Sequence, residues 1–164
     1  MSRIDSYRLD EVDRRIVYEL MRDARDLSVP SLAEELDIAP GTVRNRIDRL
    51  TDEGVIDGTT ALIDFERAGG RLRVLYMCTV PAAERDRLAE EALALPGVIN
   101  VRVLMAGRRD LHVEAVGEDT EDLRHIAREL STLDIRIEDE ELVEDEHRAP
   151  YEPFRDGERP ADGE

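Results

Sequence analysis

The chain has 164 residues, of which 41% are hydrophobic and 4% aromatic, so it can form one or two small domains with aliphatic cores. It carries 40 acidic residues, 23 arginines and no lysine, for a formal net charge of −17. No apolar run is long enough to cross a membrane and the N-terminus lacks a signal-peptide apolar region, so we expect a cytoplasmic protein. The single Cys78 excludes an internal disulfide and is expected to be buried.

The acidic charge argues against nucleic-acid binding, because contacts with phosphates require cations. We favour another interpretation, in which the acidity is an adaptation to concentrated salt and local clusters of arginine are kept for function. This hypothesis of a halophilic source expects folding to need high salt, and folding in dilute buffer would count against it.

Residues 10–52 are expected to form three helices, because apolar residues recur on one helical face of each. Asp10 can cap the first helix, and Ser28 can cap the second with Pro30 in its first turn. The segment 37–41 (DIAPG) separates the second helix from the third. The three apolar faces consist of Val12, Ile16 and Leu20, then Leu32, Ala33 and Leu36, and finally Val43, Ile47 and Leu50.

Residues 54–64 are expected to form a short β-hairpin, which begins at GVIDG (54–58) and returns through ALID (61–64). Three helices followed by a small hairpin give the outline of a winged helix-turn-helix. We therefore assign residues 8–64 to a DNA-binding domain.

The third helix has the chemistry of a DNA-reading helix. Its segment 40–50 holds three arginines and one aspartate, a basic stripe on an acidic chain. With the apolar residues facing inward, Thr42, Asn45 and Arg49 point outward, and Arg44 and Arg46 lie on the flanks. The flanks suit phosphates, while on the outward face arginine can bind guanine and asparagine can bind adenine. An exposed helix with ordinary salt bridges is the alternative. The predicted DNA-binding residues are Thr42, Arg44, Asn45, Arg46 and Arg49.

The glycine pair at residues 69–70 marks a joint, and the pattern beyond it becomes β-α-β-β-α-β. This order predicts a ferredoxin-like, ACT-like domain over residues 71–145, which makes the fold class α+β. The expected strands are 72–80, 98–105, 111–117 and one that opens at Ile135, and the expected helices are 82–95 and one capped by Asp119.

The first of these strands is apolar on both faces, with Val74 and Tyr76 on one face and Leu75 and Met77 on the other. The domain's own helices cover only one sheet face, so a second copy of the sheet is the simplest cover for the other. We therefore expect a homodimer or a higher homo-oligomer. A monomer whose open face is partly covered by the tail is the alternative.

The last 27 residues, 138–164, contain twelve acidic residues and three arginines. With several prolines and glycines added, this composition is typical of disorder, and we expect residues 146–164 to be an acidic, disordered tail.

Taken together, the motifs resemble the leucine-responsive regulatory protein (Lrp)/AsnC family, and the charge suggests a member from a halophilic archaeon. Both halves appear in the expected order over roughly residues 8–145, although Ala39 stands where a serine commonly caps the recognition helix. The matching segments are LDEVDRRI (9–16), SLAEEL (31–36), TVRNRIDRL (42–50), EGVI (53–56), ALID (61–64), PGV (96–98) and GRRDL (107–111).

The resemblance implies a transcriptional regulator that binds double-stranded DNA, dimerises through its sheets and often forms larger assemblies. It also implies an effector, an amino acid or related small molecule, at the contact between dimers, where ligand binding would modulate oligomerisation. The family's Gly-x-x-Asp turn falls on Gly107 and Asp110, which are the predicted effector-binding residues. Arg109 stands where an aromatic residue often precedes the aspartate.

Two other functions are open. Relatives with the same outline include sirohaem decarboxylases, but residues 99–102 (INVR) lack the His and Tyr of their motif. A sensor or partner-binding module without DNA binding would suit the charge of −17. We expect no catalytic residues, no cofactor and no metal site, because His112, His125 and His147 have no metal-ligand spacing.

Overall fold

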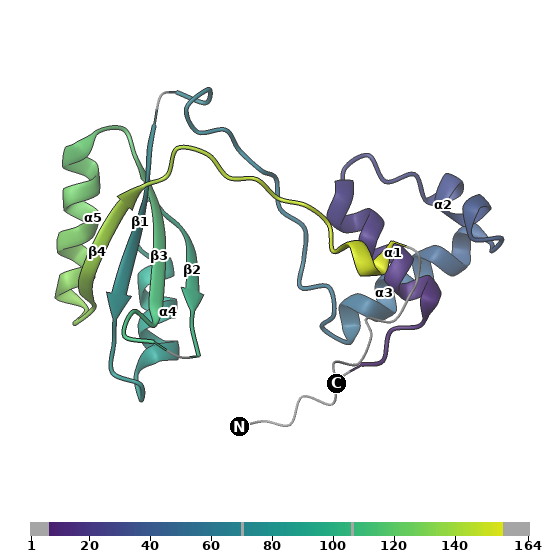
Figure 1. Cartoon of the computed structure of the whole chain (residues 1–164), viewed down its shortest axis with the longest axis horizontal. Coiled ribbons are helices and arrows are strands. Elements are labelled where there is room, and N and C mark those ends of the chain that lie inside the picture. Colours follow the sequence, from purple (N-terminus) through teal and green to yellow (C-terminus); the bar gives the residue numbers. More distant parts are fainter. Residues whose placement is uncertain (1–6, 70, 106, 156–164) are drawn as a thin grey trace. The chain divides into compact units, whose positions relative to one another are not determined.

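The computed structural model describes residues 7–69, 71–105 and 107–155 (Figure 1). The chain forms two compact units. The first takes the chain up to Ala61 and again from His147 onward, and the second is Leu62–Glu146. Each unit is described by itself.

Three helices form the first unit, as the apolar periodicity predicts. Asp10 caps the first helix and Ser28 caps the second, where its side chain accepts a hydrogen bond from the Ser31 backbone N–H. The helices enclose an aliphatic core of Ile16, Leu32, Ala33, Val43 and Leu50. Their bounds are Glu11–Asp23 for α1, Val29–Glu35 for α2 and Pro40–Asp52 for α3.

The prediction of a hairpin at residues 54–64 is wrong, because the structure has no strand in this described segment. The backbone N–H groups of Val55 and Ile56 instead donate to the Leu50 carbonyl at 2.9 and 3.1 Å and close the end of α3. Farther along, Leu62 and Ile63 are exposed. An isolated two-stranded hairpin without a packed face is marginal in water, which accounts for the extended segment.

The second unit confirms the β-α-β-β-α-β order. Its four strands form one antiparallel sheet in the order β2-β3-β1-β4, so the first strand lies inside the sheet. The elements are β1 (Leu72–Thr79), α4 (Arg85–Leu93), β2 (Val98–Val103), β3 (Leu111–Gly117), α5 (Thr120–Thr132) and β4 (Arg136–Leu142).

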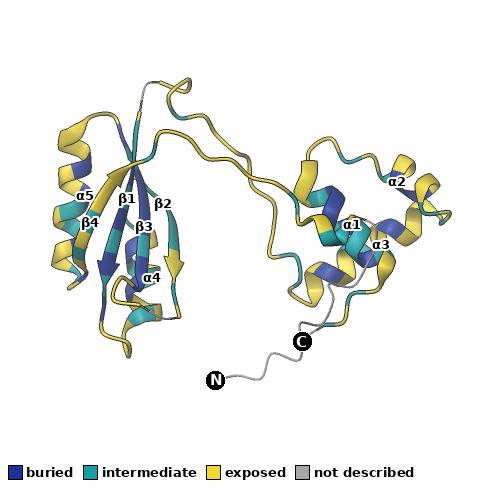
Figure 2. Cartoon of the chain, in the orientation of Figure 1, coloured by how far each residue is buried: buried dark blue, intermediate teal, exposed yellow. Residues whose placement is uncertain are grey.

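The helices α4 and α5 pack on one face of this sheet, where β1 and β3 contribute the buried residues (Figure 2). Tyr76 lies in this core, and its hydroxyl donates to the Leu123 carbonyl at 2.7 Å. Gly97 makes the turn into β2 with a φ of +88°, and a Cβ there would lie 2.8 Å from Ile126 Cδ1. A residue with a Cβ would be strained by this positive φ and would crowd the Val116 carbonyl at 3.0 Å, so glycine suits the turn.

The other sheet face is less apolar than the sequence pattern predicts. Leu75 and Met77 are half-buried there, but the neighbouring strand places the buried carboxylate of Glu114 on the same face. Arg73 donates to Glu114, and Arg102 lies 3.4 Å from it. Arg73 also contacts Glu146, so the face combines apolar side chains with a cluster of two arginines and two glutamates that is neutralised within the chain.

The prediction of a disordered tail from residue 146 is wrong for the described residues up to 155. A 3-10 helix, η1 (Glu152–Phe154), packs on α1 (Figure 1). Arg15 donates to the carbonyl of Arg155 at 2.9 Å, and the Tyr151 and Phe154 rings meet edge to face at 4.9 Å. The remaining residues, 156–164, lie outside the described part of the chain. The acidic composition of the tail predicts disorder, but the short aromatic cluster of Tyr151 and Phe154 is enough to order residues 152–154.

If η1 stabilises the first unit, the double variant Tyr151→Ala/Phe154→Ala should lower its free energy of unfolding by about 1–2 kcal/mol, because half-buried rings lose their contacts. Urea unfolding of the full chain, followed by hydrogen exchange of α1 amides, measures this loss. Leu62→Ala is the control, since Leu62 is 67% exposed. Unchanged protection of α1 in the double variant would contradict the assignment.

Candidate DNA interface

The outward side of α3 carries Thr42, Arg44 and Asn45, and all three are exposed. Helical geometry predicts the outward positions of Thr42 and Asn45, because Val43 and Leu50 are fully buried on the opposite side. It predicts Arg49 as the third outward residue and Arg44 on the flank, but Arg49 pairs with a buried acid and Arg44 is the exposed arginine. Within the described residues, the side chains of Arg44 and Asn45 make no hydrogen bond or ion pair. This edge of the helix therefore offers a cation and an amide that the rest of the described chain leaves available.

Arg46 and Arg49 lie differently, because both contact acids at the start of α1. Nη1 of Arg46 lies 2.5 Å from an oxygen of Asp10 and 2.8 Å from Oδ1 of Asp13. Nη2 of Arg49 lies 3.1 and 3.3 Å from the two oxygens of Asp13. The Arg46 side chain is 24% exposed and that of Arg49 is 46% exposed, so neither is a free surface cation.

Asp13 is the centre of this cluster and is only 1% exposed. It forms a capping box with Asp10, in which each side chain accepts a hydrogen bond from the other's backbone N–H. Tyr7 closes the cluster, with its hydroxyl 3.4 Å from Asp13 and its ring 5.5 Å from the Arg49 guanidinium carbon. We call Asp10, Asp13, Arg46 and Arg49 the α1–α3 charge cluster.

The role of Asp13 is not among the predictions from the sequence, although the sequence carries one signal for it. Asp13 lies three residues before Ile16, so it falls on the inward stripe of α1. An acid on an apolar stripe indicates a buried carboxylate that needs cations from a neighbouring element. The capping pattern alone explained Asp10 but not the buried position of Asp13.

The charge cluster also changes proton affinities. Burial alone would raise the pKa of Asp10, but hydrogen bonds from Arg46 and from the Asp13 backbone lower it below its ordinary value. The hydrogen bond to Asp10 raises the pKa of Arg46. Asp10 is therefore ionised and Arg46 charged at neutral pH, so the cluster keeps its ion pair.

The predicted effector turn has a buried aspartate and an exposed glycine. Gly107 has a φ of +120° with open space around it. The two carboxylate oxygens of Asp110 accept hydrogen bonds within the chain, one from the Val80 backbone at 3.1 Å and one from Arg85 at 2.6 Å. The carboxylate therefore anchors the turn to β1 and α4, while Arg108 and Arg109 stay exposed.

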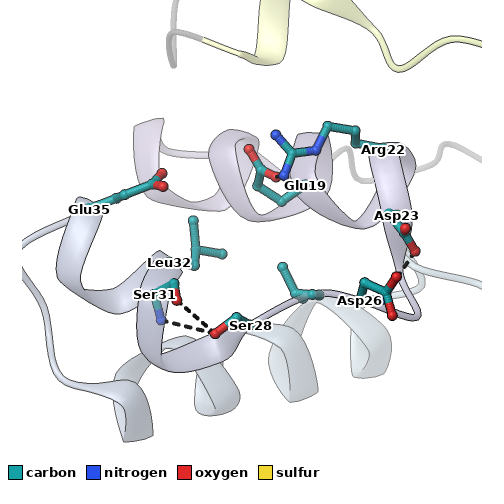
Figure 3. Close-up of a pocket in the computed structure, with 9 residues that line it drawn as sticks. Glu19, Arg22, Asp23, Asp26, Ser28, Ser31, Leu32 and Glu35 are labelled. Atoms are coloured by element: carbon teal, nitrogen blue, oxygen red, sulfur yellow. Dashed lines mark hydrogen bonds and ion pairs between the residues drawn. The ribbon is translucent and has the colours of Figure 1, made fainter.

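A cavity of about 340 Å³ lies between α1 and α2, and four of its nine lining residues are acidic (Figure 3). No predicted DNA-binding or effector-binding residue lines it. Among the described residues, no group of three or more His, Cys, Asp or Glu side chains is arranged to hold a metal ion. The described helices include none with the length and apolarity to cross a membrane. The cavity is lined by Glu19, Arg22, Asp23, Asp26, Leu27, Ser28, Ser31, Leu32 and Glu35.

Comparison with known proteins places the first unit in a known class. Residues 9–57 match the family model described as winged helix-turn-helix DNA-binding. An uncharacterised HTH-type transcriptional regulator of Pyrococcus abyssi is 31% identical over 126 residues, which cover 77% of this chain and 84% of the relative. The similarity thus extends through both units.

Solved structures show the same two-domain fold. The crystal structure of AldR from Mycobacterium tuberculosis aligns with a TM-score of 0.71 and 31% identity, over 85% of this chain and 97% of that one. LrpC of Bacillus subtilis aligns with a TM-score of 0.68 and 22% identity, over 87% of this chain and 99% of the other.

If Asp110 anchors the turn, Asp110→Asn should lower the free energy of unfolding of the second unit by about 2 kcal/mol at pH 7, because Arg85 loses its ionic partner. Burial would raise the pKa of Asp110, but hydrogen bonds from Val80 and Arg85 lower it overall. This stabilisation is complete above the ordinary aspartate pKa and is lost as the pH falls through the lowered one.

Urea unfolding at pH 7 and at about pH 3 measures both effects, since the ordinary aspartate pKa is about 3.9. The difference between wild type and Asp110→Asn should shrink at the lower pH. Asp139→Asn is the control, because Asp139 pairs with Arg109 at 3.3 Å through a half-exposed side chain. Equal stability of Asp110→Asn and wild type at pH 7 would refute the anchoring role.

Proposed function

Since the chain belongs to the Lrp/AsnC family of DNA-binding transcriptional regulators, we propose that it binds its operator through the outward side of α3. Thr42, Arg44 and Asn45 enter the major groove, where arginine can donate twice to guanine and asparagine can bind adenine. Arg46 and Arg49 lie at the flank and contact phosphates. One observation carries this proposal, namely a basic, exposed helix edge on a chain of charge −17.

Operator binding works best with two copies of the chain. A homodimer presents two recognition helices to half-sites about 34–36 Å apart. We propose that the open sheet face of the second unit forms this dimer. Leu75 and Met77 supply apolar contact there, and Arg73 and Glu114 are already paired with each other within the chain.

We propose that the turn between β2 and β3 binds a small effector, an amino acid or a related molecule, and that binding shifts the assembly state. Asp110 holds the turn in place through Arg85 and Val80. Gly107 leaves open space beside it, and the exposed Arg108 offers a cation to a carboxylate. The protein then acts in the cytoplasm as a regulator without catalysis and without a cofactor.

A DNA-binding assay tests the proposal with the double variant Arg44→Ala/Arg46→Ala. We expect a loss of affinity of about tenfold to a hundredfold, and a decrease of roughly 2 in the slope of log affinity against log salt, because two cationic contacts disappear. The duplex is the one that wild-type protein selects most strongly from a random pool, and the assay is run over a range of potassium chloride concentrations.

Arg124→Ala/Arg128→Ala is the matched control. It makes the same charge change on α5, where both side chains are more than 60% exposed. Equal affinity of the α3 variant and the wild type would remove these arginines from the interface. Selection of no duplex by the wild type would favour the partner-binding alternative.

A further inference from the structure

An acid lies against the predicted DNA-binding side of the first unit, and it contacts two of the cations there. Asp13 is 1% exposed and contacts Arg46 at 2.8 Å and Arg49 at 3.1 Å. These contacts use one terminal nitrogen of each guanidinium, Nη1 of Arg46 and Nη2 of Arg49. Within the described residues, no hydrogen bond engages the other guanidinium nitrogens of either side chain.

We propose that Asp13 is a positioning residue for DNA binding, which fixes Arg46 and Arg49 so that their unengaged nitrogens face the phosphates of the duplex. This inference rests on the proposed function. According to this inference, the buried acid Asp13 strengthens the binding of DNA, although DNA is itself negatively charged. Asp10 assists, because its carboxylate holds the same nitrogen of Arg46 at 2.5 Å.

The physical reason is the flexibility of arginine. A free arginine side chain loses rotamer entropy when it binds a phosphate. The guanidinium is planar with five donors in a fixed fork, so a carboxylate on one side leaves donors on the other side in a defined direction. Asp13 therefore fixes both arginine side chains in the free protein, so that less rotamer entropy is lost when DNA binds.

The burial of Asp13 matters for the proposed high-salt setting. Concentrated ions screen exposed charge pairs strongly, but they screen buried pairs much less. Since only the carboxylate side of these pairs is buried, with Arg46 24% and Arg49 46% exposed, we expect them to be less sensitive to salt than the fully exposed pairs of the chain. Asp10, whose side chain is 50% exposed, is more sensitive to salt.

Positioning and simple electrostatics predict opposite changes in DNA affinity for Asp13→Asn. Removal of a negative charge near the duplex should strengthen DNA binding if charge alone mattered. Loss of positioning should weaken it, because Asn offers one neutral acceptor oxygen where the carboxylate offered two charged ones. The sign of the change therefore separates the two explanations.

The experiment measures the affinity of full-length Asp13→Asn for the duplex that the wild type selects, in high potassium chloride and below the unfolding temperature of the variant. We expect a loss of about tenfold. In the background of Arg46→Ala/Arg49→Ala, the same substitution should change affinity by less than about threefold, because the residues that it positions are absent.

Equal or tighter binding by Asp13→Asn would overturn the inference. The proposed function would stand in that case, because the wild type still binds the duplex. A loss of similar size in the arginine-free background would also overturn the inference, because Asp13 would then act only through the fold. Failure of the wild type to select any duplex would refute the proposed function and the inference with it.

A second variant covers the case in which Asp13→Asn does not fold. Asp10→Asn keeps an efficient helix cap. The Asp10 side chain is 50% exposed, so we expect the fold to tolerate this substitution. We expect a loss of affinity of about threefold, which disappears when Arg46 is alanine. Retention of full affinity by Asp10→Asn would then overturn the inference.

Discussion

The arrangement of the first unit depends on one constraint, the burial of the Asp13 carboxylate. A charge that is 1% exposed is costly unless it is paired and hydrogen-bonded. Arg46 and Arg49 meet this requirement from α3, and the backbone of Asp10 meets it from the start of α1. The same contacts therefore cap one helix, dock another and orient two cations.

This constraint explains how an acidic chain can keep a basic surface. Acids are abundant, so an arginine on a flexible stem would find many partners. Arg46 and Arg49 form ion pairs with a buried acid, whereas Arg44 and Asn45 make no side-chain hydrogen bond or ion pair in the described part of the chain. In the second unit, Asp110 plays a comparable part, because its two oxygens secure the turn after β2 to β1 and α4. Buried carboxylates thus order both predicted sites.

Much of the fold could be predicted because it follows from local pattern, namely helical periodicity in residues 10–52 and strand-helix alternation beyond 71. The prediction of a hairpin at 54–64 is wrong, because two strands pair stably only when one face is packed against other elements. The positions of the glycines do not show whether such packing exists. The exposure of Thr42 and Asn45 follows from helix geometry alone. The pairing of Asp13 with Arg46 could not be read from the sequence, because 33 residues separate them and their contact depends on how α1 crosses α3.

The most direct measurement is a crystal structure of the full-length protein with its selected duplex. We expect α3 to enter the major groove and the Asp13 carboxylate to stay in contact with Arg46 and Arg49 while their other nitrogens contact phosphates. A complex in which both arginines have left Asp13 to reach the DNA, or in which the duplex lies on another face, would contradict this expectation.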